Sequence, residues 1–590
     1  MMKELETKVR GLDAVLRNGL RLPTAQEGLV LLIKGPPGSG KTTLALQLAL
    51  AAKDWDCETR EAIEIRSHEQ HSDDIRALLK RLATSPNSTG LDVLGREVPE
   101  SDTDTVDNLL PSVSWARNLV AKLNTEDREF RLLMIDGLNL VVDSERHLVD
   151  LEVMVSVLRR KSTVGILVYE PGGSGMETVD FLADLVIEMK GEAISEGPNI
   201  PEYFLQHIRV CKSRFQRSVL GWHQYKIRET GVEIYPSIHY RIQAGAPEQK
   251  QSPTVAANFD GSKRSVADHA QEAQKTQSKQ GGIEEVESII GHMLGSYTLA
   301  EGNSVTVVLG ARRAWKTMLT LDWLRQGAKE GQPSLLVSLM DDIPTIIEQR
   351  AQLCKYICPR NDESKGNCKG LDCYKNVFPF YFRPGCIAPC EFFDYLCRRI
   401  EGKEKNETGE YYGKIKRFLF WDLVQLEYRF PLLSSDPLFL PGLMDYLKYQ
   451  RRIPAVFMGP ASSRLAKVAS AIADNVIFSW QDMTTEVAGK ESTEGWCFYV
   501  DRVAGQPERG RLHFIKKPSE GPARQEKLDG QATYETLIET HGDKKEPPFE
   551  RASAYIEAIQ ALQGLPLGMA PKEGQTTGTK SASKPRRPNS

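Results

Sequence analysis

The sequence predicts an α/β protein made of two similar domains, each with a mostly parallel central sheet. Two observations support this prediction. Short apolar runs alternate with longer stretches of helical periodicity, which is the pattern of strands joined by crossover helices. The same order of runs occurs again after a polar segment, as expected for a tandem duplication. At 590 residues the chain is long enough to bury two such cores.

The predicted strands are short, apolar and free of strict alternation, as in parallel sheets covered on both faces. In the first half they are GLVLLIKG, EAIEIRS, RLLMIDG, VGILVYE and ADLVIEMKG, and in the second half SVTVVLG, PSLLVSL, KRFLFWD, IPAVFMG and DNVIFSW. Helix-like pieces such as TTLALQLALAAK supply the crossovers, and each half ends in further β-rich sequence.

Composition places the boundaries between these regions. We expect a first domain over residues 1–243 and a second over 283–520. Residues 244–282 carry almost no large apolar side chain, so we expect them to form a flexible linker. A helical extension over 521–570 and a disordered tail over 571–590 complete the predicted organisation.

The charge and hydropathy of the chain exclude some classes of protein. A formal net charge of -3 gives no global field that attracts nucleic acid or an anionic membrane, although a local basic groove is compatible with it. The N-terminus lacks the apolar core of a secretory signal, and no apolar run approaches the roughly 20 residues of a membrane helix. We therefore expect a cytoplasmic protein with no membrane partner, and nucleic acid is not indicated as a partner.

The first half contains the pattern of a phosphate-binding loop, GPPGSGKTT, directly after the strand LVLLIK. Glycines let successive backbone N–H groups curl around a phosphate, and the following helix points its positive end at the same place. Lys41 can reach the β- and γ-phosphate oxygens, and the Thr42 hydroxyl can bind Mg²⁺. The predicted nucleotide-binding residues of this loop are Gly35, Pro36, Pro37, Gly38, Ser39, Gly40, Lys41, Thr42 and Thr43.

Two acids follow later strands of the same half. Asp136 ends the strand RLLMID, where a carboxylate can hold Mg²⁺. Its alternative role is to cap the next turn. Glu69 follows the second strand, where a carboxylate can activate the water that attacks the γ-phosphate. Its alternative role is that of a solvated acid at a helix start.

Taken in order, five segments of the first half resemble the KaiC-type branch of the RecA-like ATPases. They are GLDAVLRNGL, GPPGSGKTTLALQLA, EQHSDDI, MIDGLNLV, and RVCKSR followed by YKIRETGVEIYP. The resemblance covers about residues 10–240, and more weakly 285–520. It implies two tandem RecA-like P-loop domains, with ATP bound between adjacent subunits of a homo-oligomeric ring, usually a hexamer.

The resemblance also assigns roles to residues outside the loop. The K-x-R element of the family matches Lys212 and Arg214, which implies that they reach the γ-phosphate of the neighbouring subunit. Their alternative role is that of exposed charges at a strand edge. The family's pair of glutamates after the second strand is Glu69 and Gln70 here, so the second acid is replaced by a neutral amide. This departure puts the rate of hydrolysis in doubt.

The second half carries an altered counterpart of the loop, GARRAWKT. Trp315 stands where Gly40 stands in the first half, and its indole would fill space that a phosphate needs. Asp341 and Asp422 are expected at the positions of Glu69 and Asp136. We interpret the second half as a degenerate domain with weak or no ATP binding and a role in assembly or partner recognition. A rearranged but working nucleotide site is the competing interpretation.

An insertion over residues 354–397 of the second half is rich in cysteine. Four thiolates suit Zn²⁺, and an iron–sulfur cluster would accept the same set, while free or buried thiols explain the cluster equally well. The candidate zinc ligands are Cys354, Cys358, Cys368 and Cys373, whereas apolar surroundings predict that Cys386, Cys390 and Cys397 are core residues.

Together these motifs favour an Mg²⁺-dependent ATPase that acts in its first domain and uses its second for assembly or regulatory output. One alternative is a nucleotide-gated regulatory protein with little turnover, for which Gln70 and Trp315 both argue. Another is a RecA-like recombination or repair ATPase. The loop PGGSGMETVD weighs against it, because this loop has neither the basic nor the aromatic residues that bind single-stranded DNA.

Overall fold

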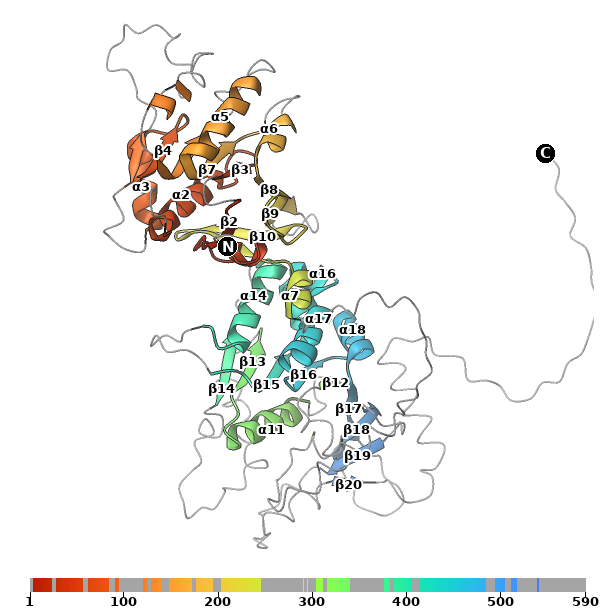
Figure 1. Cartoon of the computed structure of the whole chain (residues 1–590). Coiled ribbons are helices and arrows are strands. Elements are labelled where there is room, and N and C mark those ends of the chain that lie inside the picture. The colour runs from red at the N-terminus through yellow and green to blue at the C-terminus, as the bar shows by residue number, and fades with distance from the viewer. Residues whose placement is uncertain are drawn as a thin grey trace, which may run out of the picture.

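Two α/β halves make up the chain in the computed structural model, the first coloured red to yellow and the second green to blue in Figure 1. The structure describes residues 4–23, 28–56, 62–83, 91–94, 120–121, 123–125, 129–138, 148–171, 177–194, 203–245, 290, 294, 304–310, 316–339, 376–381, 387–404, 413–483, 494–503, 511–516 and 538–540.

A mixed, mostly parallel sheet forms the centre of the first half. Its strand order is β11-β10-β9-β8-β3-β7-β6-β4-β5. Neighbours from β8 to β5 run parallel, and β9, β10 and β11 continue the sheet antiparallel. The strands are β3 (Leu29–Lys34), β4 (Ala62–Ser67), β5 (Asp92–Leu94), β6 (Phe130–Asp136), β7 (Ser162–Tyr169), β8 (Leu185–Ile194), β9 (Tyr203–Ser213), β10 (His223–Arg228) and β11 (Gly231–Tyr235).

The second sheet repeats this order strand for strand, as β14-β13-β15-β16-β12-β17-β18-β19-β20 read from its parallel end. Its strands are β12 (Val305–Gly310), β13 (Ser334–Ser338), β14 (Val377–Tyr381), β15 (Arg417–Trp421), β16 (Ala455–Gly459), β17 (Asn475–Met483), β18 (Glu494–Arg502), β19 (Arg511–Lys516) and β20 (Ile538–Thr540). The shared order is the arrangement expected from the repeat in the sequence.

Helices cover both faces of each sheet, which explains the continuous apolar runs. In β3, Leu31 and Ile33 pack into a core with α2 and α3, while Val30 and Leu32 pack into a second core with α5. The first half contains α1 (Leu12–Val15), α2 (Lys41–Ala51), the 3₁₀ turn η1 (Ala52–Asp54), α3 (Ser72–Leu82), α5 (Leu148–Lys161), α6 (Glu177–Leu182) and α7 (Ile238–Gly245). The second contains α11 (Lys316–Lys329), α14 (Pro389–Ile400), α15 (Leu423–Arg429), α16 (Pro431–Ser435), α17 (Phe439–Asp445), the π-helix η7 (Tyr446–Arg451) and α18 (Arg464–Ile472).

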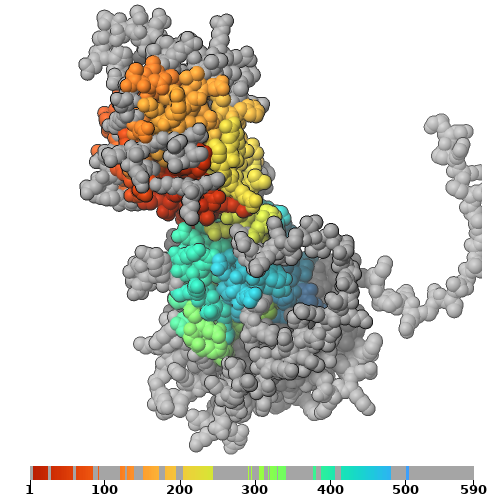
Figure 2. All heavy atoms as spheres, viewed as in Figure 1, coloured from red at the N-terminus to blue at the C-terminus, as the bar shows by residue number. Residues whose placement is uncertain are grey.

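The two halves meet through the end of the first. Tyr235 of β11 and Ile238 of α7 are buried in the core of the second half. Close packing of α7 on α17 requires a glycine, because a Cβ at Gly442 would lie 2.7 Å from Ile242 Cδ1 and 2.8 Å from Ile238 Cγ2. Figure 2 shows this contact as yellow atoms of the first half against green and cyan atoms of the second. At the N-terminus, β1 (Glu4–Leu5) pairs with β2 (Leu20–Arg21).

The predicted α/β class with mostly parallel sheets is confirmed. Part of the extension over 521–570 differs from the prediction, because β20 adds a strand to the open edge of β19 instead of a helix. The first half also extends past residue 243, since α7 ends at Gly245. Residues 246–282 of the predicted linker and the tail lie outside the described residues. No helix in the described part of the chain is long and apolar enough to cross a membrane.

Candidate active site

The predicted phosphate loop lies at the carboxyl end of β3, a central strand between β7 and β8. Gly38 and Gly40 have φ values of 72° and 83°, in the left-handed region that favours glycine. A Cβ at Gly40 would lie 2.7 Å from Ile227 Cδ1, and one at Gly35 would lie 2.4 Å from the Met189 carbonyl oxygen. The loop therefore needs its glycines for backbone conformation and for close packing on β8 and β10.

Lys41 is the first residue of α2 and lies inside this loop. Its side chain is 8% exposed, and its Nζ donates to the Pro36 carbonyl oxygen at 2.8 Å. Glu170, directly after β7, places a carboxylate oxygen 3.7 Å from the same Nζ. Burial lowers the pKa of Lys41, while Glu170, Glu69 and Asp136 act in the opposite direction. The lysine is thus a buried cation held among acids at the edge of the sheet.

Asp136 and Thr42 come together as predicted. The Thr42 hydroxyl donates to Asp136 Oδ1 at 3.1 Å, and the Ser67 hydroxyl donates to Oδ2 at 3.0 Å. Asp136 is fully buried, and burial raises its pKa despite these two hydrogen bonds and the charge of Lys41. Hydroxyl and carboxylate oxygens are the hard ligands that Mg²⁺ prefers, so this donor set fits that ion.

Glu69 belongs to the same group of charges. Burial raises its pKa most, and the charge of Asp136 raises it further, whereas Lys41 lowers it. Its side chain also packs against the turn after β6, where a Cβ at Gly137 would lie 2.8 Å from Glu69 Cγ. The backbone N–H groups of Glu69 and Gln70 both donate to Ser67 Oγ, which fixes the start of this segment.

Lys212 and Arg214 lie on and just after β9, and both contact α6 of their own chain. Lys212 Nζ donates to the Asp180 and Phe181 carbonyl oxygens at 2.8 Å each. Arg214 donates to the Phe181 carbonyl oxygen at 2.7 Å and to Asp184 Oδ1 at 3.4 Å. Both side chains are therefore held by hydrogen bonds and are not free charges at a strand edge.

The sequence analysis did not single out four residues that contribute to this site. Ser67 orients Asp136, and Glu170 follows β7 just as Asp136 ends β6, so the same strand-end rule could have found it. Tyr225 and Ile227 of β10 were missed because no local pattern links them to the loop. The Tyr225 hydroxyl donates to the Ser39 carbonyl oxygen at 2.6 Å.

The corresponding edge of the second half is arranged differently. Lys316 is buried, its Nζ donates to the Gly310 carbonyl oxygen at 2.5 Å, and burial lowers its pKa to about 8. Leu32 and Val307 each lie three residues before the first glycine of their loop. Through the neighbouring strand, Leu32 is level with Ile135 and Val307 is level with Phe420, so Trp421 stands where Asp136 stands. The prediction that Asp422 occupies the position of Asp136 is therefore wrong by one residue.

Asp422 has a φ of 64° and accepts the Val424 N–H at 3.1 Å, so it caps α15. Trp315 and Asp341 lie outside the described residues.

The cysteine cluster is only partly within the described chain. Cys390 and Cys397 are buried in the core, as predicted, and burial raises their pKa to about 12. The candidate zinc ligands and Cys386 lie outside the described residues. Within the described residues, no group of three or more His, Cys, Asp or Glu side chains could hold a metal ion.

Comparisons with known proteins add no assignment. The sequence matches no protein-family model, and no curated protein matches it significantly.

Proposed function

We propose that the protein is an Mg²⁺-dependent ATPase of the KaiC-type RecA-like class, with its active site in the first half. One observation carries this proposal. A loop of phosphate-binding pattern, its lysine, a hydroxyl–carboxylate pair and a nearby glutamate gather at the carboxyl edge of one parallel sheet. Ligands of open α/β sheets bind at this edge.

Each residue then has a distinct role. The phosphates of ATP lie along the loop 35–42, and Lys41 exchanges the Pro36 carbonyl for phosphate oxygens. Thr42 and Asp136 hold Mg²⁺, which neutralises phosphate charge when bound. Glu69 accepts a proton from the attacking water, and its raised pKa makes it a stronger base than an ordinary glutamate.

Assembly and output form a second part of the proposal. The chain forms a homo-oligomeric ring, with six subunits as in the family it resembles, and works in the cytoplasm. Lys212 and Arg214 act on nucleotide held by the neighbouring subunit, and there they offset charge in the transition state. The degenerate second half serves assembly or contacts a further protein.

A second candidate is a nucleotide-gated regulatory protein with little turnover. The neutral amide of Gln70, beside the proposed catalytic Glu69, favours it. Both candidates require nucleotide binding, so only the rate of hydrolysis distinguishes them.

Steady-state ATP hydrolysis with Mg²⁺ tests the proposal in the wild type, Lys41→Ala and the matched variant Lys316→Ala. We expect turnover that is lost in Lys41→Ala and retained in Lys316→Ala. Turnover that survives Lys41→Ala would place the chemistry in the second half. Binding without turnover in the wild type would favour the regulatory candidate, and a wild type that does not bind ATP would refute both.

A further inference from the structure

The β10–β11 hairpin (residues 223–235) lies between the phosphate loop and the second half. Successive side chains of a strand point to opposite sides, so one strand can contact two partners. Tyr225 and Ile227 of β10 face the loop, whereas Lys226 and Arg228 face α14. The hairpin is therefore a shared structural element of the two halves.

The loop side of the hairpin is closely fitted. Besides the contacts of Tyr225 and Ile227 with the loop, Gln47 of α2 holds the hairpin turn. Its Oε1 accepts the Val232 N–H at 2.7 Å, and its Nε2 donates to the Thr230 carbonyl oxygen at 3.3 Å. Gly231 has a φ of 108°, and a Cβ there would lie 2.3 Å from Gln47 Cδ. A shift of the hairpin would thus disturb both the loop and the helix that follows it.

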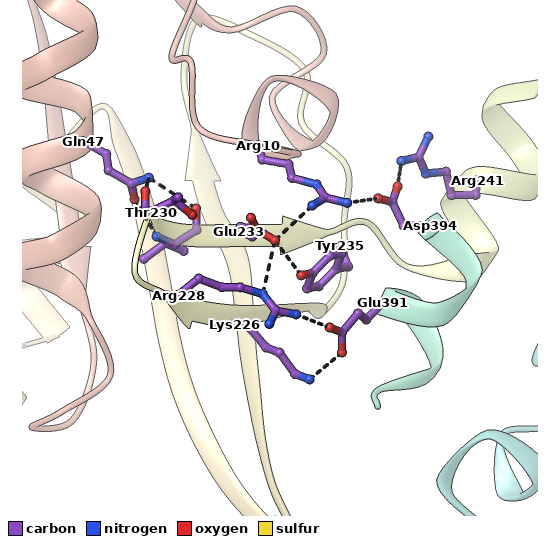
Figure 3. Close-up of polar contacts among 11 residues, drawn as sticks. Arg10, Gln47, Lys226, Arg228, Thr230, Glu233, Tyr235, Arg241, Glu391 and Asp394 are labelled. Carbon is purple, nitrogen blue, oxygen red and sulfur yellow. Dashed lines mark hydrogen bonds and ion pairs between the residues drawn. The ribbon is translucent and has the colours of Figure 1, made fainter. Parts of the chain in front are cut away.

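The other side of the hairpin is fixed by one buried carboxylate of the second half. Glu391 is 2% exposed and pairs with Arg228 at 2.6 Å and with Lys226 at 2.7 Å (Figure 3). It also accepts the Ala388 N–H at 3.3 Å and so caps α14. Beside it, the Cys390 N–H donates to Gln224 Oε1 of β10 at 2.8 Å.

A second ion-pair chain is linked to the first through Arg228, whose Nε lies 3.5 Å from Glu233 Oε2. Arg10 donates to Glu233 of β11 at 3.0 Å and to Asp394 of α14 at 3.2 Å, and Arg241 of α7 also binds Asp394 (Figure 3). Asp394 is 4% exposed. Because Glu391 and Asp394 are buried while their cationic partners are partly exposed, loss of a cation would leave a buried carboxylate poorly compensated.

We infer that Glu391 is a positioning residue for nucleotide binding, through which the second half sets the shape of the phosphate loop in the first. Glu391 orders Lys226 and Arg228, and these hold Tyr225 and Ile227 of the same strand against the loop. By thermodynamic reciprocity, nucleotide in the loop also strengthens the docking of α14 on the hairpin. This inference rests on the proposed function, since it requires that the loop binds nucleotide.

Titration of the full-length protein with a fluorescent ATP analogue tests the inference. Glu391→Gln keeps the size of the side chain and its capacity to cap α14, but it removes the charge. Glu401→Gln is the matched control. Glu401 caps the other end of α14 and binds Tyr446, Lys403 and Arg451 of the second half. We expect at least a fivefold increase in Kd for Glu391→Gln, equivalent to about 1 kcal/mol, and no change for Glu401→Gln.

Hydrogen exchange of the α14 amides measures the coupling between the loop and α14, and not only the affinity for nucleotide. Saturating analogue should slow exchange over residues 389–400 in the wild type and in Glu401→Gln, and the effect should be smaller in Glu391→Gln. Gln47→Ala, which releases the hairpin from α2 and leaves the ion pairs intact, should reduce it as well. This variant also serves if Glu391→Gln does not fold.

Three results would overturn the inference. An unchanged Kd in Glu391→Gln, even in a less stable protein, would show that Glu391 only joins the halves. Unchanged Kd and unchanged α14 exchange in Gln47→Ala would show that the hairpin does not couple the loop to α14. Equal effects in Glu391→Gln and Glu401→Gln would mean that net charge alone is responsible. Failure of the proposed function would give a different result, because the wild type itself would then not bind the analogue. In that case the inference would also be refuted.

Discussion

Gly137 is the residue whose replacement most directly tests the placement of Glu69. It follows Asp136 with a φ of 83°, and a Cβ there would lie 2.8 Å from Glu69 Cγ. Gly221 is a matched control, because its φ of 95° is similar and, among the described residues, no heavy atom lies within 4 Å of its Cβ position. Alanine at either site is strained, but only Gly137→Ala should displace Glu69.

The magnitudes follow from these geometries. A left-handed alanine costs about 1–2 kcal/mol, so both variants should lose a similar free energy of unfolding. At Gly137 the distance of 2.8 Å falls 0.6 Å short of the 3.4 Å at which ordinary contact begins, so Glu69 must move. Misplacement of a catalytic group by about 1 Å can cost about 100-fold in rate, and we expect a loss of roughly 10- to 100-fold in kcat.

Urea unfolding and steady-state hydrolysis of the two variants supply the test. A double variant with Glu69→Gln should be no slower than Glu69→Gln alone, because the alanine acts through that side chain. Wild-type kcat in Gly137→Ala, or an equal loss in Gly221→Ala, would refute the reasoning.

Three further predictions concern the same edge of the sheet. In the proposed mechanism Glu69 acts deprotonated. Because its pKa is raised, kcat should fall with falling pH at a higher pH than for an ordinary glutamate, and a pH–rate profile that keeps this limb in Glu69→Gln would contradict the assignment. Tyr225→Phe removes a hydrogen bond worth about 1 kcal/mol and should weaken ATP binding about fivefold by calorimetry, whereas Tyr428→Phe, at an exposed tyrosine of the second half, should not. Thr42→Ala should raise the Mg²⁺ concentration needed for nucleotide binding at least about tenfold. An equal effect of Thr43→Ala would argue against the Thr42 hydroxyl as a specific ligand of Mg²⁺.

The parts of the fold and site predicted well depend on local sequence. The strand LVLLIK followed by closely spaced glycines indicates both the buried strand and the loop, since each signal lies within a few residues. Asp136 was found because the carboxyl ends of parallel strands meet at one edge, so acids after different strands converge. The same reasoning applied to Glu170 would have extended the site.

The missed parts depend on register and on distant contacts. Asp422 was expected to be the last residue of its strand, but it lies one residue beyond the strand end. An apolar run such as FLFW does not reveal which residue ends the strand. A shift of one residue changes the side to which a strand side chain points, and Trp421 takes the position expected for the acid. Gln47 is 185 residues from its partner Val232 on the hairpin, and Tyr225 is 186 residues from its partner Ser39 on the loop, so no local pattern joins them.

Because α7 is buried against the second half, the boundary of the sequence repeat and the boundary between the two packed cores are offset by one helix. Tyr235 and Ile238 are buried in the core of the second half, although by sequence they end the first copy. A second half cut at the start of its own repeat would expose that core. In an exchange of halves between related proteins, residues 235–245 should therefore travel with the half that follows them.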